Sequence, residues 1–232
     1  MLEVGCSAFD VFHFTMKVPF ITFEGTEGCG KSTQIELLAG QIHGLGYRVR
    51  VFREPGGTPV GEEIRHTLKH SKNNAAMTPE AELLLMNASR AQLVREVIRP
   101  ALATGEIVLG DRFYDSTTAY QGYGRGLDLA LVKNVIDFAV GDTRPDLTLI
   151  LHVPREVSAE RLRSRQAILP FARDRLEEAD RHFFDRVAKG YQAVAAAEPE
   201  RVRVVDGTGH VEVVHSRIWE LVQPILPRVG RW

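Results

Sequence analysis

Short apolar runs alternate with longer segments of helical periodicity along most of this chain. The runs are five to seven residues long and rich in β-branched and aromatic side chains, which predicts strands at 20–24, 48–52, 106–111, 147–153 and 201–206. Apolar positions that recur every three or four residues predict helices at 31–44, 60–70, 79–99, 127–140, 155–165, 175–197 and 211–225. The alternation indicates an α/β fold whose parallel sheet is covered by helices on both faces.

The predicted elements form one domain over residues 17–232, because no repeat, low-complexity tract or interdomain linker interrupts them. Residues 1–16 read MLEVGCSAFDVFHFTM and contain no Lys or Arg. They lack the positive start and the continuous apolar stretch of a secretory signal. We expect them to be a dispensable extension, either mobile or ordered as an arm, with Met16 as an alternative start to Met1.

Composition excludes several classes of protein. The 29 Lys and Arg balance 30 Asp and Glu, so the basic excess of a dedicated nucleic-acid binder is absent and no nucleic-acid partner is expected. No apolar run approaches the roughly 18 residues of a membrane-spanning helix, so no membrane partner is expected either. The two cysteines, Cys6 and Cys29, cannot build a disulfide framework, and free thiols fit the cytoplasm.

The strongest chemical signal is a phosphate-binding loop of the form G-x-x-x-x-G-K-[ST] between the first strand and the first helix. Its glycines let backbone N–H groups surround phosphate oxygens, and the helix adds its positive N-terminal end. The Lys31 ammonium would reach the β- and γ-phosphates, and the Ser32 hydroxyl would bind Mg²⁺. The candidate nucleotide-binding residues are Gly25, Thr26, Glu27, Gly28, Cys29, Gly30, Lys31, Ser32 and Thr33. Cys29 is interpreted as a small loop residue, with a redox role as the alternative.

Two further segments follow strands and should line the same crevice, because loops at the carboxyl ends of parallel strands bind ligands. REPGG at 53–57 follows the second strand and is either a substrate contact or a purely structural turn. Asp111 and Arg112 end the third strand, where the carboxylate can order Mg²⁺ and the guanidinium can clamp a phosphate. STTAYQG at 116–122 is dense in groups that hydrogen-bond a base, although Ser116 alone fits a helix N-cap equally well.

Arginines supply the remaining candidates. Met86 and Arg90 lie four residues apart on one face of a predicted helix, where Arg90 needs either a ligand or a buried acid as its partner. The segment 161–175 carries Arg161, Arg163, Arg165, Arg173 and Arg175 and is interrupted by Pro170. It is predicted to be a mobile basic lid that closes over phosphates, with solvated surface charge as the alternative.

Taken in order, these motifs resemble those of bacterial thymidylate kinases. The matching segments are FEGTEGCGKST (23–33), REPGGT (53–58), ASRAQ (88–92), DRF (111–113), STTAYQG (116–122), RPDLT (144–148) and DRLE (174–177). The resemblance implies a P-loop NTPase fold with the five-stranded parallel sheet of nucleoside-monophosphate kinases. It also implies transfer of the ATP γ-phosphoryl group to dTMP, giving dTDP for dTTP synthesis, with Mg²⁺ as cofactor and a homodimer as the assembly.

The resemblance also implies roles for single residues. Arg112 would grip the dTMP phosphate, Glu27 would meet the 3′-hydroxyl, and Tyr120 would pack against the sugar. Residues around the thymine would be Arg90, Ser116, Thr117 and Gln121, with Met86 at a position where the family usually has phenylalanine. Residues that border the acceptor would be Arg53, Glu54, Pro55 and Arg65. Mg²⁺ would be held, directly or through water, by Ser32, Glu54 and Asp111.

Catalysis would then rest on Lys31, Asp111, Arg112 and arginines of a lid at about 161–176. Some relatives carry an arginine in the P-loop after the acidic residue, whereas others supply it from the lid. Gly28 follows Glu27 here, so the chain resembles the second arrangement, with Arg165 and Arg173 as candidates.

Two other functions compete with this interpretation. A different nucleotide or deoxynucleoside kinase would differ in its preferred acceptor. A P-loop switch without transfer activity would need no second basic clamp, whereas this chain has Arg53, Arg90, Arg112 and the lid.

Overall fold

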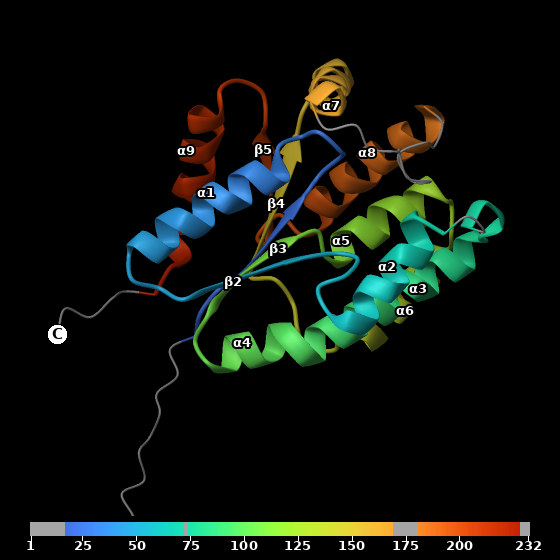
Figure 1. The fold of residues 1–232 in the computed structure, drawn as a ribbon, viewed down its shortest axis with the longest axis horizontal. Coiled ribbons are helices and arrows are strands. Elements are labelled where there is room, and N and C mark those ends of the chain that lie inside the picture. Colours follow the sequence, from blue (N-terminus) through green and yellow to red (C-terminus); the bar gives the residue numbers. More distant parts are fainter. Residues whose placement is uncertain (1–16, 72–73, 169–180, 228–232) are drawn as a thin grey trace, which may run out of the picture.

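The five predicted strands form one parallel sheet in the computed structural model, which describes residues 17–71, 74–168 and 181–227. The strand order is β2-β3-β1-β4-β5 (Figure 1). Every strand begins and ends within one residue of its prediction: β1 Phe20–Glu24, β2 Val49–Arg53, β3 Ile107–Asp111, β4 Leu147–His152 and β5 Val202–Asp206. The predicted fold class is therefore confirmed.

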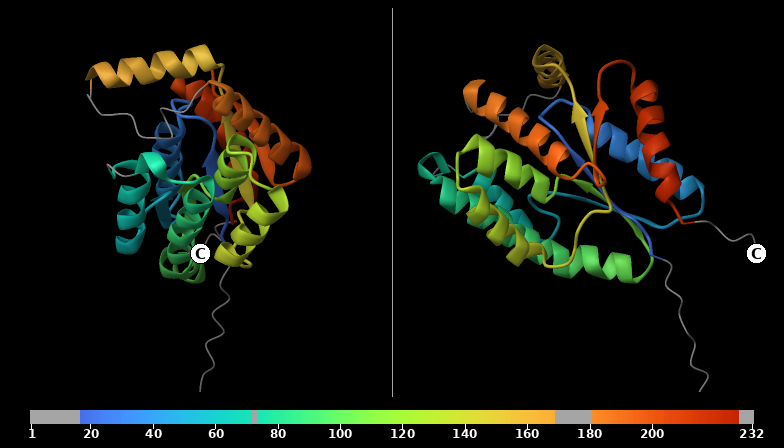
Figure 2. Two further views of the ribbon diagram at one scale, coloured as in Figure 1. Left: turned by 90° about the vertical axis from the view of Figure 1, so that its right-hand side faces the viewer. Right: turned by 180° about the vertical axis from the view of Figure 1, so that it is seen from behind.

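Helices cover both faces of the sheet, as the apolar runs required. One face is covered by α1 (Lys31–Gly44) and α9 (Val211–Val222), which pack against each other (Figure 1). The helices of the other face are α3 (Pro79–Leu93), α4 (Arg99–Ala103), α6 (Leu129–Val140) and α8 (Arg181–Ala197). The helix α2 (Pro59–Lys69) packs on α3, and α7 (Arg155–Ile168) lies across the carboxyl edge of the sheet (Figure 2).

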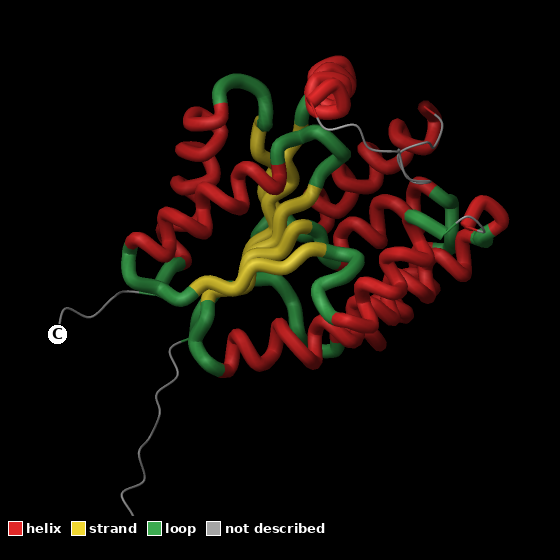
Figure 3. Tube along the Cα trace, viewed as in Figure 1, coloured by secondary structure: helices red, strands yellow, loops and turns green. Residues whose placement is uncertain are grey.

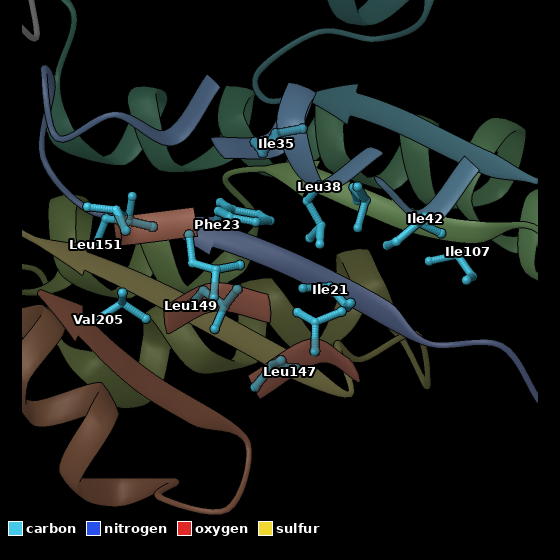
Figure 4. Packing of buried hydrophobic residues seen from close by; sticks show 14 of the residues in the cluster. Ile21, Phe23, Ile35, Leu38, Ile42, Ile107, Leu147, Leu149, Leu151 and Val205 are labelled. Carbon is cyan, nitrogen blue, oxygen red and sulfur yellow. The ribbon is translucent and has the colours of Figure 1, made fainter. Parts of the chain in front are cut away.

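Successive strand residues serve opposite faces, because side chains alternate along a strand. In β1, Ile21 and Phe23 pack into the cluster beneath α1 and α9, together with Leu149 of the neighbouring strand (Figure 4). Phe20 belongs to the other face, where its ring lies 5.1 Å from that of Phe113 in an edge-to-face arrangement. These two layers hold the sheet rigidly and so fix the positions of the loops at its carboxyl edge.

Four predicted helix boundaries differ from the structure by two residues or more, the smallest difference being the start of α6 at Leu129 instead of 127. The helix expected at 79–99 continues through a π-helical segment, Val94–Ile98, into α4, and this widened turn accommodates Pro100. The helix expected to end at 165 continues to Ile168, so the first part of the expected lid is helical. The last helix ends at Val222, and a 3₁₀ turn, Gln223–Ile225, carries the final apolar position.

One pair of helical segments was not predicted at all. α5 (Tyr114–Thr117) runs directly into the π-helical η3 (Thr118–Gly124). The polar side chains of Ser116, Thr117 and Gln121 are buried there, so the segment lacks the apolar periodicity that identifies a helix. A short 3₁₀ turn, Asn74–Ala76, completes the described elements. None of the helices in the described part of the chain is both long and apolar enough to span a bilayer.

Candidate active site

The register of the sheet brings three motif segments to one edge. Phe23 of β1 lies beside Asp111 of β3, and the Phe23 carbonyl accepts the Arg112 amide N–H at 2.9 Å. The Glu54 amide N–H donates to the Asp111 carbonyl, also at 2.9 Å. The phosphate-binding loop, the turn after β2 and the segment after β3 are thus neighbours, and their loops gather at the same end of the strands (Figure 3).

The loop between β1 and α1 has the geometry of a phosphate cradle. Gly25 has φ +129°, and a Cβ there would lie only 2.5 Å from the Leu151 carbonyl oxygen, so no larger residue fits. The buried Lys31 Nζ donates to the carbonyl oxygens of Gly25 at 3.2 Å and Thr26 at 3.0 Å. The ammonium is therefore held at the rim of the loop, where phosphate oxygens can take over these hydrogen bonds. Cys29, predicted as a small loop residue, is buried in the core cluster.

Ser32 and Asp111 supply oxygen ligands at the mouth of this loop. Ser32 Oγ donates to Asp111 Oδ2 at 3.0 Å, and the serine is exposed. A hydroxyl and a carboxylate are the hard oxygen donors that Mg²⁺ prefers, so these two residues fit the ion. No group of three or more His, Cys, Asp or Glu side chains suited to a metal occurs within the described ranges.

Arg112 is the centre of the polar network next to the loop. Its φ of +71° lies in the left-handed region, which costs a non-glycine residue about 1–2 kcal/mol. Its guanidinium donates to Glu27 Oε1 at 2.7 Å and to Tyr120 Oη at 3.3 Å, and also to Ser116 Oγ and Tyr191 Oη, both at 3.1 Å. The strained backbone is thus maintained by four side-chain contacts, as is common at functional sites.

Charge holds the Glu27 carboxylate in its ionised form. Burial raises the pKa of Glu27, but the positive charges of Arg112 and Lys31 outweigh it and lower that pKa well below the usual range. Glu27 therefore remains an acceptor for Arg112 and for a ligand hydroxyl at all physiological pH values.

Glu24 lies behind Arg112 and was not identified from the sequence. This carboxyl group is fully buried at the end of β1 and accepts the amide N–H groups of Phe113 and Ser116, the Ser116 hydroxyl and the Tyr191 hydroxyl. Burial and the nearby Asp115 raise its pKa to about 7, although Arg112 opposes the shift. A charged residue within the otherwise apolar run FITFE is the sequence signal that marks it.

A polar pocket opens beside the loop and collects most of the predicted acceptor residues. Its lining is Glu27, Glu54, Pro55, Lys69, Met86, Arg90, Arg112, Ser116, Thr117, Tyr120 and Gln121. Arg53 and Arg65 are not part of it. Arg53 pairs with Glu62 at 3.0 Å, and Arg65 Nη1 donates to the Pro55 carbonyl at 2.8 Å, so both hold the turn after β2. Lys69 was not predicted.

The Arg90 guanidinium is paired with Glu54 in the wall of this pocket. Both side chains are at most 3% exposed, and Arg90 Nη2 lies 2.6 Å from Glu54 Oε2. Arg90 Nε also donates to Glu54, Nη1 donates to Asn87 and Thr117, and Nη2 donates in addition to the Phe113 carbonyl. A buried acid is therefore the partner of Arg90, and the Glu54 carboxylate is engaged by Arg90 rather than by the Ser32–Asp111 pair.

The expected lid is described only in part. Arg161 Nη2 donates to the Gly207 carbonyl at 3.1 Å and Nη1 to the Cys29 carbonyl at 3.4 Å, which fixes α7 to the loop. Arg165 lies in α7, but its side chain is outside the described part of the structure, as is the whole of Arg173. Residues 1–16, the expected extension, also lie outside the described residues.

A larger cavity of about 390 Å³ lies behind the loop, between α7 and α8. Apolar side chains such as Ile150, Leu162 and Phe184 line most of it. The smaller pocket holds Arg112 and most of the predicted acceptor residues, so we take it as the candidate acceptor site.

Comparisons with known proteins agree with this geometry. The family model described as thymidylate kinase matches residues 23–218. A thymidylate kinase of Syntrophotalea carbinolica is 48% identical over 201 residues, which is 86% of this chain and 93% of that protein. One from Thermomicrobium roseum is 47% identical over 212 residues, 91% of this chain and 98% of that protein. The crystal structure of thymidylate kinase from Ehrlichia chaffeensis superposes with a TM-score of 0.71 at 32% identity, covering 90% of this chain and 100% of that one.

Proposed function

The chain belongs to the thymidylate kinase family and phosphorylates dTMP to dTDP, and from this premise we propose which residues carry each part of the reaction. The P-loop binds the phosphates of ATP, and the polar pocket beside it binds dTMP. The observation that supports this division most directly is the ion pair between Arg112 of the pocket and Glu27 of the loop. If Arg112 binds the acceptor, this contact supports an acceptor phosphate close to the donor loop.

On the donor side, the amides of residues 25–33 and Lys31 bind the ATP phosphates, and Ser32 and Asp111 hold Mg²⁺. When bound, the ion neutralises negative charge on the phosphate oxygens. Glu54 contributes to this site directly or through water while both of its oxygens also accept from Arg90, since each carboxylate oxygen has two lone pairs.

On the acceptor side, Arg112 binds the dTMP phosphate, Glu27 accepts from the 3′-hydroxyl and Tyr120 packs against the sugar. Met86, Thr117 and Gln121 surround the base. The acceptor is already a phosphate anion, so the reaction needs no strong general base. Catalysis consists of bringing two polyanions together and neutralising their charge, which is what the arginines and Lys31 provide.

The lid completes the charge neutralisation through Arg165 or Arg173. Support comes from Gly28, the position where other relatives carry an arginine. A Cβ on Gly28 would lie 2.8 Å from the Ser158 carbonyl oxygen of α7, so a side chain there is sterically excluded. The positive charge that other relatives supply from the P-loop must then come from a residue outside the loop. Alanine variants of the lid arginines, assayed at saturating ATP and dTMP, identify which arginine acts.

The assembly is a homodimer in which α3 and α6 meet their symmetry mates. These two helices pack on each other and carry large exposed apolar side chains. Phe138 is 86% exposed, Leu131 is 49% exposed seven residues earlier on α6, and Leu84 of α3 is 60% exposed. Sedimentation of the wild type and of Phe138→Asp tests this arrangement, since a charge in the interface should release monomers.

The substrate assignment is tested by a coupled ADP-release assay with dTMP, dUMP, dCMP, AMP, GMP and thymidine as acceptors. The proposal requires dTMP to give the highest kcat/KM. Calorimetry with dTMP in the absence of ATP should also show binding, because the pocket is assembled from the protein alone. Preference for another monophosphate would overturn the base-pocket assignment.

A further inference from the structure

The side-chain amide of Gln121 is oriented by a buried acid outside the pocket. Gln121 lies in η3 and is buried in the pocket wall. Its Nε2 donates to Glu82 Oε1 of α3 at 2.7 Å, and Glu82 is completely buried. A carboxylate can only accept hydrogen bonds, so the amide NH₂ has to face Glu82. The side-chain oxygen Oε1 of Gln121, to which no hydrogen bond is made by the described residues, is then the end left for a ligand, whereas the backbone carbonyl of Gln121 accepts the Leu127 amide N–H.

Arg125 keeps Glu82 in this acceptor role. Its guanidinium donates to both carboxylate oxygens, from Nη2 to Oε2 at 3.0 Å and from Nε to Oε1 at 3.2 Å. This two-point contact is the geometry of an ionised carboxylate with a guanidinium. Arg125 is itself held over the Phe183 ring, 4.7 Å from its centroid. The orientation of Gln121 is thus fixed by a chain of contacts that begins outside the pocket.

The Thr117 side chain, in contrast to that of Gln121, presents a hydrogen-bond donor to the pocket. Its Oγ1 accepts a hydrogen bond of 2.9 Å from Arg90 Nη1, and it lies one helical turn before Gln121 on the same pocket wall. The Thr117 hydroxyl proton is left to donate. The Arg90 N–H groups donate to Glu54, Asn87, Thr117 and the Phe113 carbonyl, so a contact from Arg90 to a base would have to share or replace one of these hydrogen bonds.

We propose that Glu82 is a positioning residue for base selection: it fixes Gln121 so that the pocket presents an acceptor beside the Thr117 donor. This pattern complements the imide edge of thymine, in which a ring N–H donor stands next to a carbonyl acceptor. Cytosine presents an amino donor and a ring-nitrogen acceptor, the reverse pattern. The inference rests on the proposed function, because it takes this pocket to be the dTMP site. Sites built around such hydrogen bonds can reject a mismatched analogue by roughly 10⁴-fold or more.

The test is Glu82→Gln, with kcat/KM measured for dTMP, dUMP and dCMP. A glutamine at 82 both donates and accepts, so the Gln121 amide can turn over. The dTMP to dCMP ratio should then fall by roughly tenfold or more, the range expected when a buried hydrogen bond no longer discriminates. The dTMP to dUMP ratio should not change, because uracil keeps the imide edge and lacks only the methyl group. Equal loss with all three acceptors would show a merely structural role and overturn the proposal.

Two controls separate this inference from the proposed function. Glu80→Gln, an acid-to-amide change at an exposed position of the same helix, should leave both ratios unchanged. Gln121→Met removes the amide but leaves the Glu82–Arg125 pair. If Gln121→Met keeps wild-type discrimination, the dTMP-site assignment is wrong. If Gln121→Met loses the preference for dTMP over dCMP while Glu82→Gln keeps it, only the role of Glu82 is wrong. If Glu82→Gln does not fold, Glu82→Asp replaces it, because the shorter carboxylate withdraws from Gln121. The dTMP to dCMP ratio of Glu82→Asp should fall in the same way, and equal loss with all three acceptors would again overturn the proposal.

Discussion

Arg112 Nη2 lies 2.7 Å from Glu27 Oε1, which joins the segment after β3 to the P-loop. Both side chains are partly accessible, at 13% and 28%, so the pair lies at the boundary between the loop and the polar pocket rather than in the core. An acceptor phosphate bound by Arg112 would therefore lie next to the loop that holds the donor. Together with the Ser32–Asp111 hydrogen bond, this pair connects the loop to the segment after β3.

Replacing Arg112 with lysine should weaken dTMP binding by about 10- to 100-fold, because charge-assisted hydrogen bonds are worth roughly 1.5–3 kcal/mol each. A lysine ammonium is a point charge and cannot reproduce the guanidinium fork that contacts Glu27, Tyr120 and Ser116. Titration calorimetry with dTMP, and separately with a non-hydrolysable ATP analogue, measures the two affinities. The ATP analogue should bind normally, and Arg50→Lys, in a surface pair with Glu106, is the matched control. Normal dTMP affinity in Arg112→Lys would contradict the assignment.

Replacing Glu24 with glutamine should remove a pH-dependent loss of stability. The carboxyl group titrates near 4.5 when unfolded and near 7 when folded. Between these values the folded protein holds a proton that the unfolded chain has released, so the free energy of unfolding falls as pH rises and levels off above about pH 7. A shift of this size corresponds to about 3 kcal/mol.

Urea unfolding at pH 5, 6, 7 and 8 tests this for both proteins. Glutamine can keep the hydrogen bonds to Ser116 and Tyr191, so Glu24→Gln should fold. Its stability relative to the wild type should increase with pH and then become constant. Parallel stability curves would mean that Glu24 is ionised throughout, with Arg112 outweighing burial and the charge of Asp115.

Lys31→Met should reduce turnover by about 10²- to 10³-fold, the usual effect of losing a charge-stabilising donor at the reacting group. Within the described part of the chain the Lys31 hydrogen bonds go to the carbonyls and thiol of its own loop, and Lys31 acts on the acceptor side through its charge near Glu27, so dTMP affinity should remain within about twofold of the wild type. Steady-state kinetics and dTMP calorimetry measure both quantities. Lys133→Met, which removes an exposed lysine paired with Asp137, controls for the loss of charge. Near-normal turnover would refute the role of Lys31.

The sequence predicted the sheet and the loop because each is encoded locally. An apolar run such as FITFE is sufficient to identify a strand, and the glycines and Lys31 identify the cradle. The contacts that orient the site are not local. Glu82 lies in the first turn of α3, where an acidic side chain usually faces solvent and complements the helix dipole. In the structure it is buried and contacts Gln121, which is 39 residues away in the sequence.

The α5–η3 segment was missed for a related physical reason. Its hydrogen-bonding side chains point inward, toward the pocket and its supporting acids, so its polarity resembles that of an exposed loop. Likewise Arg90 was recognised as a residue that needs a partner, but only the structure shows Glu54 to be that partner. Functional sites break the rule that polar residues face water, and sequence patterns fail there first.

Met86→Phe should lower the dissociation constant for dTMP about fivefold without changing that for ATP. The sequence left open whether Met86 is core filler, like its apolar neighbours, or a platform for the base. Leu83 packs into the core beneath α3, whereas Met86 is half-buried and lines the polar pocket. This placement favours the platform role, since the pocket is where we place the thymine ring.

The size of the effect follows from comparing two kinds of contact with an aromatic ring. An aromatic side chain that stacks on a base contributes about 1–3 kcal/mol, whereas a methionine sulfur contributes roughly 0.3–1.5 kcal/mol. The difference is on the order of 1 kcal/mol, or about fivefold in affinity. Calorimetry with dTMP and with ATP on both proteins measures the change in affinity, and ATP serves as the internal control because we place its site at the P-loop. Unchanged or weaker dTMP binding by a well-folded Met86→Phe would mean that Met86 does not lie against the base, or that Tyr120, already in the pocket wall, provides the stacking surface instead.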